Sequence, residues 1–464
     1  MQLIPTVVCL FMATLIAACQ SSEKSEKDPA AIRLITLDPG HFHAALVQKM
    51  MYEGVDSVVH VYAPEGQDLQ LHLNKIQGYN TRPDNPTHWK EDVYKGADFL
   101  DKMLADRATL GNAKNVVVMS GNNRLKSDYI QKTVGAGFNV LADKPMVINA
   151  STFDQLKESF ATAEKNKVLL YDIMTERYEI STMLQRAFSR QAGLFGTLEK
   201  GTPGNPAVTK ESVHHFYKDV SGSILTRPSW FMDVAQQGEG IVDVTTHLVD
   251  LVQWECFPEQ IIDYQKDISL TSARRWTTDM SLSQFKAITK QNSFPDYLKK
   301  DVVNDSILRV YSNGEINYQL RGIHAKVSVT WAYKAPAGAG DTHYSIMRGT
   351  KANLVIRQAA AQQYKPTLYI EAVTGNKDLE ASLKAVLPKI QQEFPGVEVK
   401  KVASGWEVII PSTYKEGHEA HFGRVAQKYL DYLKAGKMPT WEVPNMIAKY
   451  YTTTQALELA KKAK

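Results

Sequence analysis

The chain has 464 residues and only 3 cysteines: Cys9, Cys19 and Cys256. Cys9 falls within an apolar N-terminal run, and we expect Cys19 to be acylated. Cys256 is then left without a partner, so no intrachain disulfide is expected. Cysteines with metal-ligand spacing are also missing. His418 and His421 are close together in the sequence, but the sequence indicates no third metal ligand for them. We therefore interpret them as ordinary histidines at a helix start and predict no metal site.

An excess of charge of one sign is missing as well. The 54 Lys and Arg against 50 Asp and Glu give a net charge of +4, which offers no case for nucleic-acid binding. The length exceeds what a single hydrophobic core usually organises, so we expect two domains.

No apolar run is long enough for a comfortable membrane-spanning helix. The one at residues 1–18 ends in Leu15-Ile-Ala-Ala-Cys19, which resembles a bacterial lipobox and implies that Cys19 carries lipid, although no Lys or Arg precedes the run as signal peptides normally require. The alternative is a buried N-terminal helix. Residues 1–19 are thus read as signal and lipobox, and the polar residues 20–30 as a flexible tether. We expect a lipid-anchored protein of the cell envelope, on the periplasmic side or the cell surface.

The glycine turn of a dinucleotide-binding fold is incomplete. A short apolar strand at 33–37 is followed by Asp38-Pro-Gly-His-Phe-His43, where G-x-G-x-x-G would let the backbone approach a pyrophosphate. Only Gly40 matches. Asp38 adds negative charge, and His43 fills the place where a helix packs closely. His41 or His43 would have to donate to the phosphates instead.

Alternating strands and helices nevertheless run to residue 175 and predict a Rossmann-like α/β domain with six parallel strands over residues 31–175. Residues 67–94 are polar, with Pro and Asn, and are predicted to be a long loop. Further strands are expected at 57–63, 115–119, 139–143 and 168–172, and helices at 126–137 and 151–165.

The stretch from Gly238 to Asp250 (GEGIVDVTTHLVD) predicts a helix that starts near Gly240. Asp243 and His247 stand four apart and would share one helical face. A carboxylate beside an imidazole holds it in one tautomer for proton transfer. The alternative is a helix with a buried, hydrogen-bonded histidine.

A second motif lies about a hundred residues upstream, where the strand Asn139-Val-Leu-Ala ends in Asp143-Lys144-Pro145. With the later D-x-x-x-H helix, this order resembles the Gfo/Idh/MocA family of oxidoreductases, which carry E-K-P after the fifth strand. The resemblance implies NAD or NADP as cofactor. It places Lys144 beside the reacting hydroxyl, His247 as the base that removes the hydroxyl proton, and Asp243 as its orienting partner and a substrate ligand. Asp250 is expected to be structural.

Further cofactor contacts follow from the same resemblance. Glu65 follows the second strand, where an acidic residue grips the adenosine ribose, although an ordinary loop glutamate is an equal alternative. Asn122 or Asn123 matches an asparagine beside the nicotinamide. The full expected set is Gly40, His41, His43, Glu65, Asn122, Asn123, Asp143 and Lys144.

Residues 176–420 predict an α+β domain with a large, mostly antiparallel open sheet, through which we expect homo-oligomers. Its strands are expected at 305–311, 315–320, 326–333, 343–349 and 353–358. Helices in residues 421–464 are expected to pack back on the first domain. By resemblance, the stretch before the D-x-x-x-H helix lines the substrate pocket. Paired donors over an aromatic plane suit a sugar, and the expected contacts are His214, His215, Lys218, Arg227 and Trp230. The alternative places Trp230 in the core and His214 in solvent.

The sequence therefore predicts an NAD(P)-dependent oxidoreductase of a sugar or polyol hydroxyl. In the cell envelope no soluble dinucleotide pool would re-oxidise the cofactor, so we expect it to stay bound and to be recycled. One alternative is redox-neutral glycoside cleavage within the same family. The other is a sugar-binding lipoprotein on a decayed dehydrogenase scaffold, which the missing glycines favour and the retained Lys144, Asp243 and His247 oppose.

Overall fold

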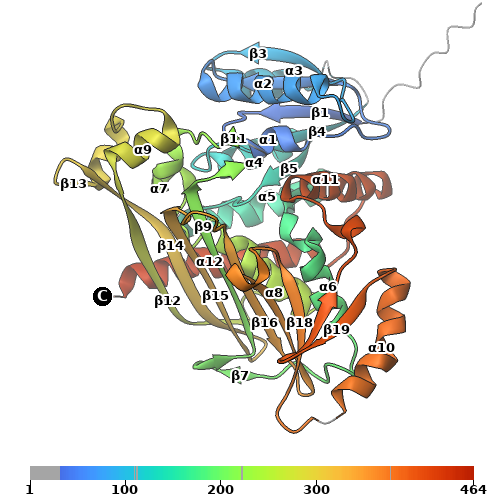
Figure 1. Ribbon diagram of the computed structural model, residues 1–464. Coiled ribbons are helices and arrows are strands. Elements are labelled where there is room, and N and C mark those ends of the chain that lie inside the picture. The colour runs from blue at the N-terminus through green and yellow to red at the C-terminus, as the bar shows by residue number, and fades with distance from the viewer. Residues whose placement is uncertain (1–31, 109, 111–112, 221–222, 377, 464) are drawn as a thin grey trace, which may run out of the picture.

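The computed structural model describes residues 32–463 apart from 109, 111–112, 221–222 and 377. Cys19, the lipobox and the expected tether lie outside the described residues. Figure 1 shows a smaller N-terminal domain (blue to cyan) above a larger one (green to orange). Among the helices described, none is both long and apolar enough to cross a bilayer.

The first domain is built on a parallel six-stranded sheet of order β3-β2-β1-β4-β5-β6. Its central strands are almost continuously apolar and buried, as strands covered on both faces must be. The predicted Rossmann-like sheet is confirmed. The strands are β1 (Ile32–Leu37), β2 (Val58–Ala63), β3 (Lys90–Lys95), β4 (Lys114–Met119), β5 (Asn139–Asp143) and β6 (Leu170–Ile173); the helices are α1 (His43–Leu46), α2 (Gln67–Thr81), α3 (Phe99–Asp106), α4 (Lys126–Gly135) and α5 (Phe153–Lys165).

The long loop predicted at residues 67–94 is wrong, because this stretch holds helix α2 and edge strand β3. Helix α2 buries only Leu69, His72 and Ile76, which recur at helical spacing among polar residues. Only a narrow face of α2 is buried, so its helical pattern is weak in the sequence, and the Asn and Pro residues that follow favoured the loop prediction.

The second domain is organised by a large mixed sheet of order β12-β14-β15-β9-β16-β17-β18-β20-β19, with β13 paired to β14. Only the β15–β9 pair is parallel, so the mostly antiparallel prediction is confirmed. The strands are β9 (Val208–Tyr217), β12 (Ile268–Ser281), β13 (Val302–Val303), β14 (Ile307–Leu320), β15 (Ile323–Lys334), β16 (Thr342–Arg348), β17 (Ala352–Gln358), β18 (Thr367–Ala372), β19 (Glu398–Val402) and β20 (Gly405–Ile409); β7 (Gly201–Thr202) pairs with β8 (Asn205–Pro206), and β10 (Asp219–Val220) with β11 (Ser223–Ile224).

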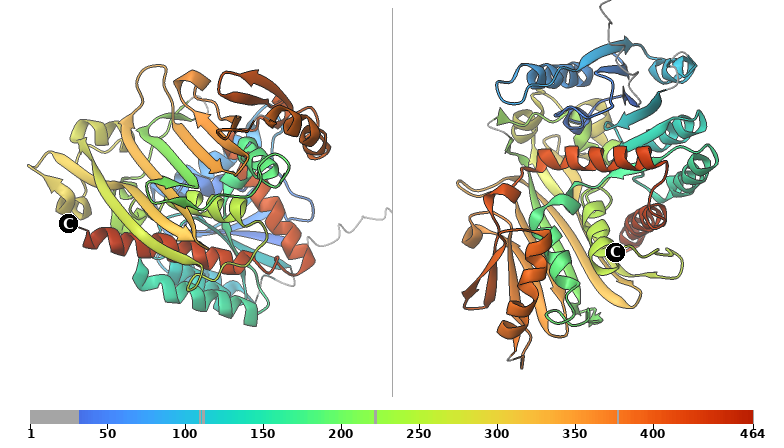
Figure 2. Two further views of the ribbon diagram at one scale, coloured as in Figure 1. Left: turned by 90° about the horizontal axis from the view of Figure 1, so that it is seen from below. Right: turned by 90° about the vertical axis from the view of Figure 1, so that its right-hand side faces the viewer.

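Helices cover the sheet on the side that faces the first domain. Figure 2 shows α12 running between the large sheet and α5, and its buried residues divide accordingly. Met446 and Tyr450 belong to the first core, whereas Ala456 and Leu457 belong to the second. The last helix therefore packs on the first domain and also joins the core of the second. The helices are α6 (Ile180–Ser189), α7 (Val234–Gln237), α8 (Thr245–Cys256), α9 (Leu282–Thr289), α10 (Leu379–Glu393), α11 (His418–Ala435) and α12 (Glu442–Lys462).

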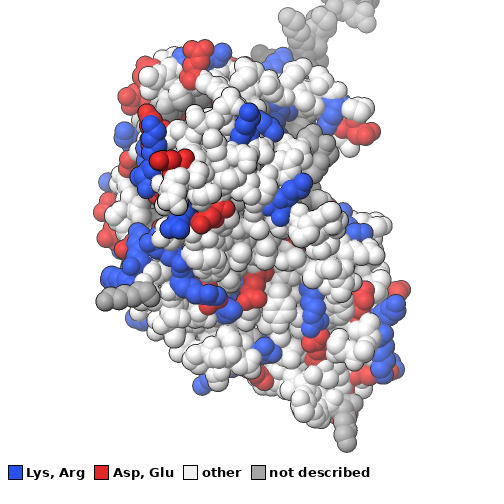
Figure 3. All heavy atoms as spheres, turned by 60° about the vertical axis from the view of Figure 1, so that its left-hand side comes forward, with Lys and Arg blue, Asp and Glu red and all other residues white. Residues whose placement is uncertain are grey.

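Basic and acidic side chains lie intermixed over the face that Figure 3 shows. Strand β15 alternates buried residues such as Val327 and Val329 with half-buried ones such as Ser328 and Thr330. One face of the large sheet thus belongs to the core, and the other is partly open.

Candidate active site

A cavity of about 410 Å³ lies where the carboxyl ends of the first sheet face the second domain. Ligands bind at this edge of open α/β sheets because the loops that follow the strands converge there. Six of the chain's 12 histidines line the cavity, and they come from both domains: His41, His43, His214, His247, His343 and His418.

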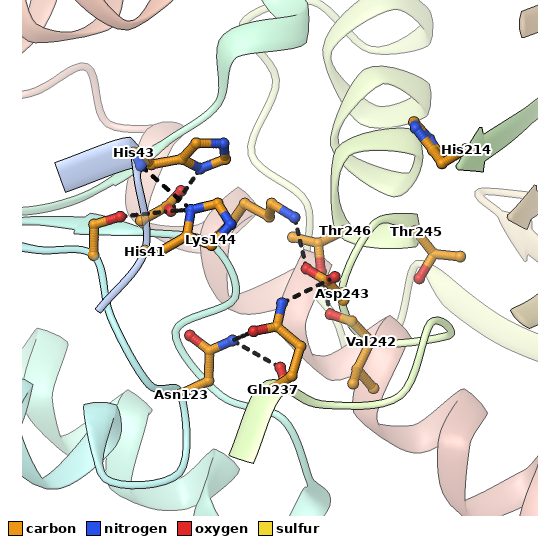
Figure 4. Close-up of polar contacts among 12 residues, drawn as sticks. His41, His43, Asn123, Lys144, His214, Gln237, Val242, Asp243, Thr245 and Thr246 are labelled. Carbon is orange, nitrogen blue, oxygen red and sulfur yellow. Dashed lines mark hydrogen bonds and ion pairs between the residues drawn. The ribbon is translucent and has the colours of Figure 1, made fainter. Parts of the chain in front are cut away.

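Lys144 and Asp243 meet across the domain boundary in this cavity. Lys144 directly follows strand β5, and its Nζ donates to Asp243 Oδ1 at 2.6 Å. Both side chains are at least nine-tenths buried. The other carboxylate oxygen of Asp243 accepts from Gln237 Nε2 at 3.1 Å. Figure 4 shows Lys144 and Gln237 approaching Asp243 from two sides. The structure thus brings together the two motifs on which the resemblance rests.

Two glycines set the path of the loop that carries Asp243. Gly238 has φ +96°, a conformation that residues with a Cβ rarely adopt. At Gly240 the backbone packs against strand β14, where an added Cβ would lie 1.8 Å from the carbonyl oxygen of Ser312. Helix α8 consequently begins at Thr245, later than the predicted start near Gly240. Asp243 lies in the preceding turn, held by backbone packing rather than by helix geometry.

His247 lies on α8 and lines the same cavity, but no hydrogen bond joins it to Asp243. Among the described residues its Nδ1 is buried and has no partner. Burial and the nearby charge of Lys144 lower the pKa of His247 to about 3, so the imidazole is neutral at pH 7. The expected Asp243–His247 pair is therefore wrong in its contact, because Lys144 and Gln237 already occupy both oxygens of Asp243.

Asn122 and Asn123 hold the domains together in this structure. Asn123 Nδ2 donates to the Gln237 carbonyl at 2.7 Å, and Asn122 Nδ2 donates to Gln236 Oε1 at 2.6 Å. The amides expected to contact a nicotinamide are thus used to dock the loop after β4 onto helix α7. Asn123 still lines the cavity, and Asn122 is not among its lining residues.

His41, His43 and Asp143 form a cluster at the edge of the cavity (Figure 4). The Asp143 Oδ2 atom lies 2.9 Å from His43 Nδ1 and 4.0 Å from His41 Nδ1, and it also accepts from Ser120 Oγ at 2.9 Å. Burial lowers the pKa of both imidazoles, so both are neutral at pH 7. His43 Nδ1 donates its ring proton to the Asp143 carboxylate, and His41 Nδ1 accepts from the His43 backbone N–H at 3.3 Å.

A second cavity of about 260 Å³ lies beyond Gly40, beside the ends of β1 and β2. Glu65 lines it, as expected of a residue that follows the second strand, together with Asp38 and Asp68. Trp230 also lines this cavity and not the main one, so its expected place in the substrate pocket is wrong. Its indole packs over Gly40 and donates to Asp68 Oδ2 at 2.9 Å, which draws it away from the substrate side.

Three of the four remaining expected substrate contacts gather around Asp341, which the sequence did not indicate. His215 Nδ1 lies 2.8 Å and Lys218 Nζ 2.9 Å from its carboxylate, and His214 Nδ1 lies 3.5 Å away. Burial alone would raise the pKa of Asp341, but the His214 hydrogen bond and the Lys218 charge outweigh it and hold the pKa low. His214 and Lys218 line the cavity, whereas His215 is not among its lining residues.

Arg227 lines the cavity but is held by the protein itself. Its Nε donates to the Phe216 carbonyl at 3.0 Å, and its guanidinium lies over Phe231 and Trp331. Burial lowers its pKa to about 10.

Glu176 and Asp341 were not identified from the sequence as site residues. Glu176 follows strand β6, and the rule that loops after parallel strands converge could have found it. Its Oε1 lies 3.3 Å from His418 Nδ1, which the sequence reading had set aside as a helix-start residue. Asp341 lies in a loop between β15 and β16 and has no comparable signal.

Comparison with known proteins places this architecture. Residues 184–461 match the family described as “Putative oxidoreductase C terminal domain”. A crystal structure described as a putative oxidoreductase from Parabacteroides merdae is 57% identical, with 93% of this chain and 98% of that chain covered and a TM-score of 0.90. No curated protein matches the sequence.

More distant solved structures share the fold. Levoglucosan dehydrogenase in complex with NADH and levoglucosan is 11% identical, covers 93% of this chain and 97% of its own, and has a TM-score of 0.59. A structure described as a putative oxidoreductase from Thermotoga maritima is also 11% identical, covers 93% and 98%, and has a TM-score of 0.58. Fold and family agree with the predicted two-domain oxidoreductase architecture. The chain belongs to the oxidoreductase family that carries this C-terminal domain.

Proposed function

We propose that this protein oxidises or reduces a sugar or polyol at a hydroxyl-bearing carbon, with NAD or NADP as the expected hydride carrier. The observation that carries the proposal is the buried Lys144–Asp243 pair, which faces a cavity of sugar size beside the neutral His247. The fold shared with levoglucosan dehydrogenase, solved with NADH and a sugar, supports it.

Each residue of this group has a distinct task in the proposed reaction. The Lys144 ammonium stabilises the negative charge that develops on the substrate oxygen. Asp243 holds that ammonium in place and can accept a second substrate hydroxyl. His247 accepts the hydroxyl proton at a ring nitrogen. Burial makes His247 a weak base, so the transfer depends on Lys144 lowering the pKa of the bound hydroxyl.

The residues expected to contact the nicotinamide and the adenosine ribose are compatible with a dinucleotide, but those expected to contact its pyrophosphate are not. The family resemblance puts Lys144 at the nicotinamide end and Glu65 at the ribose end of a dinucleotide. In support, Lys144 lines the main cavity and Glu65 lines the second. Between them, Trp230 covers Gly40, where a pyrophosphate would pass. Burial, followed by the charge of Asp68, raises the pKa of Asp38 to about 6, so this carboxylate is largely ionised at pH 7 and repels phosphate.

Two backbone N–H groups of the same loop are not free to bind phosphate. Gly40 N–H donates to the Asp38 carbonyl at 2.9 Å, and His41 N–H donates to the Ser120 carbonyl at 3.0 Å. In glycine-rich turns such groups point at the ligand. The loop in this conformation therefore does not fit a pyrophosphate.

This misfit favours a second candidate, a sugar-binding protein on a dehydrogenase scaffold. The histidines, Lys218 and Asp341 would still supply donors and acceptors to hydroxyl groups, and Trp331 an aromatic wall. Binding without turnover would then be the function of the cavity.

Dinucleotide content separates the two candidates. The purified protein is denatured, and the supernatant is examined by ultraviolet absorption and mass spectrometry. NAD, NADH, NADP and NADPH are also titrated calorimetrically into wild type and Trp230→Ala, which uncovers Gly40. The proposed function predicts dinucleotide in the supernatant or measurable binding to wild type. Absence of both, in wild type and in the variant, would exclude a dinucleotide enzyme and support the second candidate.

We also propose that the chain is lipid-anchored through Cys19 in the cell envelope and assembles with copies of itself through the partly open face of the large sheet. Such a location supports a bound, internally recycled cofactor. The full-length Cys19→Ser variant should be unlipidated and unprocessed. Membrane association at the mature mass would refute the anchor, and a monomeric mass in light scattering would refute the assembly.

A further inference from the structure

The loop after strand β1 places two imidazoles beside one carboxylate, in the position where related folds place glycines. His41 and His43 come from this loop, and Asp143 ends strand β5. Each residue offers one ligand atom, and the three atoms lie within 4.8 Å of one another. The group combines residues a hundred positions apart in the chain.

The spacing of the ligand atoms suits a first-row divalent ion. Imidazole nitrogens and carboxylate oxygens bind Zn²⁺ at about 2.1 Å, so two ligands at right angles stand about 3.0 Å apart and two in tetrahedral arrangement about 3.4 Å apart. His43 Nδ1 and His41 Nδ1 lie 2.9 and 4.0 Å from Asp143 Oδ2. For all three atoms to bind one centre, the His43 ring proton would move from Nδ1 to Nε2, and the ion would replace the His43 Nδ1–Asp143 hydrogen bond. The ion would also replace the bond from the His43 backbone N–H to His41 Nδ1 at 3.3 Å.

Neighbouring side chains hold the three residues of the cluster in place, as residues around metal ligands commonly do. Ser120 Oγ donates to Asp143 Oδ2 at 2.9 Å and fixes the carboxylate. The His41 ring stacks on Phe231 at 6.0 Å, and the His43 ring packs against Phe422 at 4.6 Å. Locked rotamers limit the entropy lost when an ion binds.

The surrounding charges leave room for a cation. Lys144 is neutralised by Asp243 at 2.6 Å. Lys126 donates to the Asp143 backbone carbonyl at 2.9 Å and to Asn123 Oδ1, and makes no hydrogen bond to the Asp143 carboxylate among the described contacts. The carboxylate of Asp143 directly faces the two imidazole rings, with its Oδ2 2.9 Å from His43 Nδ1 and 4.0 Å from His41 Nδ1.

We propose that His41, His43 and Asp143 bind one divalent transition-metal ion, of the class of Zn²⁺, Mn²⁺ or Fe²⁺, whose open coordination positions face the cavity. Two histidines and one carboxylate leave positions for water or a substrate oxygen, as catalytic sites do. A hydroxyl or carbonyl oxygen of the cavity's ligand would complete the coordination. The site is independent of the proposed function, because none of its ligands requires a dinucleotide.

The test measures metal binding directly. The full chain is purified without a polyhistidine tag, stripped with a chelator and dialysed, and Zn²⁺ and Mn²⁺ are titrated calorimetrically, with bound metal counted by plasma mass spectrometry. The expected result is one ion per chain. His41→Ala and His43→Ala should each weaken binding at least about 100-fold, and Ser120→Ala about 10- to 100-fold, as loss of a supporting partner does.

Two controls keep the result interpretable. His214→Ala removes another histidine of the same cavity, and His88→Ala removes an exposed one; both should bind like wild type. Only variants with the wild-type circular dichroism spectrum are scored, and the His41 and His43 variants provide two independent chances to meet that condition. The proposal is overturned if wild type binds neither ion, or if the His41 and His43 variants bind as tightly as wild type.

Discussion

Asp243 shows how a residue can be located correctly and paired wrongly. The D-x-x-x-H motif predicted that Asp243 and His247 lie in the same site, and both line the cavity. The Asp243 carboxylate, however, accepts a hydrogen bond from Lys144, 99 residues earlier in the chain. Spacing of four suggests a shared helical face only where the helix has begun, and α8 begins two residues after Asp243. A basic residue from another domain then competes for the carboxylate with a charge-assisted bond.

Replacement of His247 tests its role as base. His247→Ala should lower the single-turnover rate with a sugar substrate by about a hundred- to ten-thousand-fold, the usual loss for a positioned base. Metal binding should be unchanged, because His247 is outside the proposed cluster. Exposed His88→Ala is the matched control and should retain the wild-type rate. A folded His247 variant that turns over at the wild-type rate would exclude the role.

Asp38 makes stability depend on pH in a predictable direction. Its pKa is raised from 3.8 to about 6 by burial and the charge of Asp68. The folded state therefore holds the proton more tightly than the unfolded chain, so stability falls as pH rises from about 4 to about 6 and stays reduced above. At about 1.4 kcal/mol per unit, the cost is at most about 3 kcal/mol.

Asp38→Asn should remove that loss. Asn keeps the shape and tolerates the left-handed backbone, where Asp38 has φ +47°. Urea unfolding of the variant and wild type at pH 4 and pH 7.5 measures the effect. The variant should be the more stable at pH 7.5 and about equal at pH 4. A gain of equal size at both pH values would contradict the electrostatic cause.

Sequence motifs indicated which residues lie close together, whereas contacts that depend on three-dimensional packing could not be predicted, and the roles of the residues stay predictions. Lys144, Asp243 and His247 share the cavity that their order in the sequence suggested. Trp230 lies in the second cavity because its indole bonds Asp68 of the other domain. His41, His43 and Asp143 were expected together as cofactor contacts, but the sequence did not indicate that their side chains contact one another.

At the scale of elements, glycines allow two backbone segments to pack closely against each other. Strands predicted at 305–311 and 315–320 are one strand, β14, which continues through Gly314. A Cβ at Gly314 would lie 2.5 Å from the Cβ of Ile241, so this glycine makes room for the Gly240 loop. Glycine inside a strand often marks such a close approach and need not mark a turn. A sequence pattern cannot distinguish these two uses.

Gly240→Ala should therefore disturb the loop that carries Asp243. The added methyl group would collide with the Ser312 carbonyl, and overpacking of this kind costs about 1–3 kcal/mol or more. Denaturant unfolding measures the loss. Gly78→Ala in helix α2 is the control, because nothing lies within 4 Å of its added Cβ and alanine favours helix. Equal stability of the two variants would contradict the packing argument.

At the scale of the whole molecule, a buried ionic network joins the two domains. Lys449 on α12 donates to Asp250 Oδ1 on α8 at 2.8 Å and lies 2.7 Å from Asp172 Oδ2 on β6. Arg177 bonds the same Asp250 through two nitrogens at 2.7 Å. Asp250 is thus placed in a structural network, away from the cavity lining. The network and the Lys144–Asp243 contact thus both join residues of the two domains.

Lys449→Met should therefore destabilise the protein and the site together. It leaves the carboxylates of Asp172 and Asp250 buried with one fewer cation, and breaking a buried ion pair costs about 3–5 kcal/mol. Denaturant unfolding should show that loss, and Asp172→Asn in the same chain should recover part of it by removing an unpaired charge. On the same helix, Lys461→Met breaks an exposed pair with Glu458 and should change stability by no more than about 1 kcal/mol. If Lys449→Met and Lys461→Met are equally stable, the network contributes nothing to the junction of the domains.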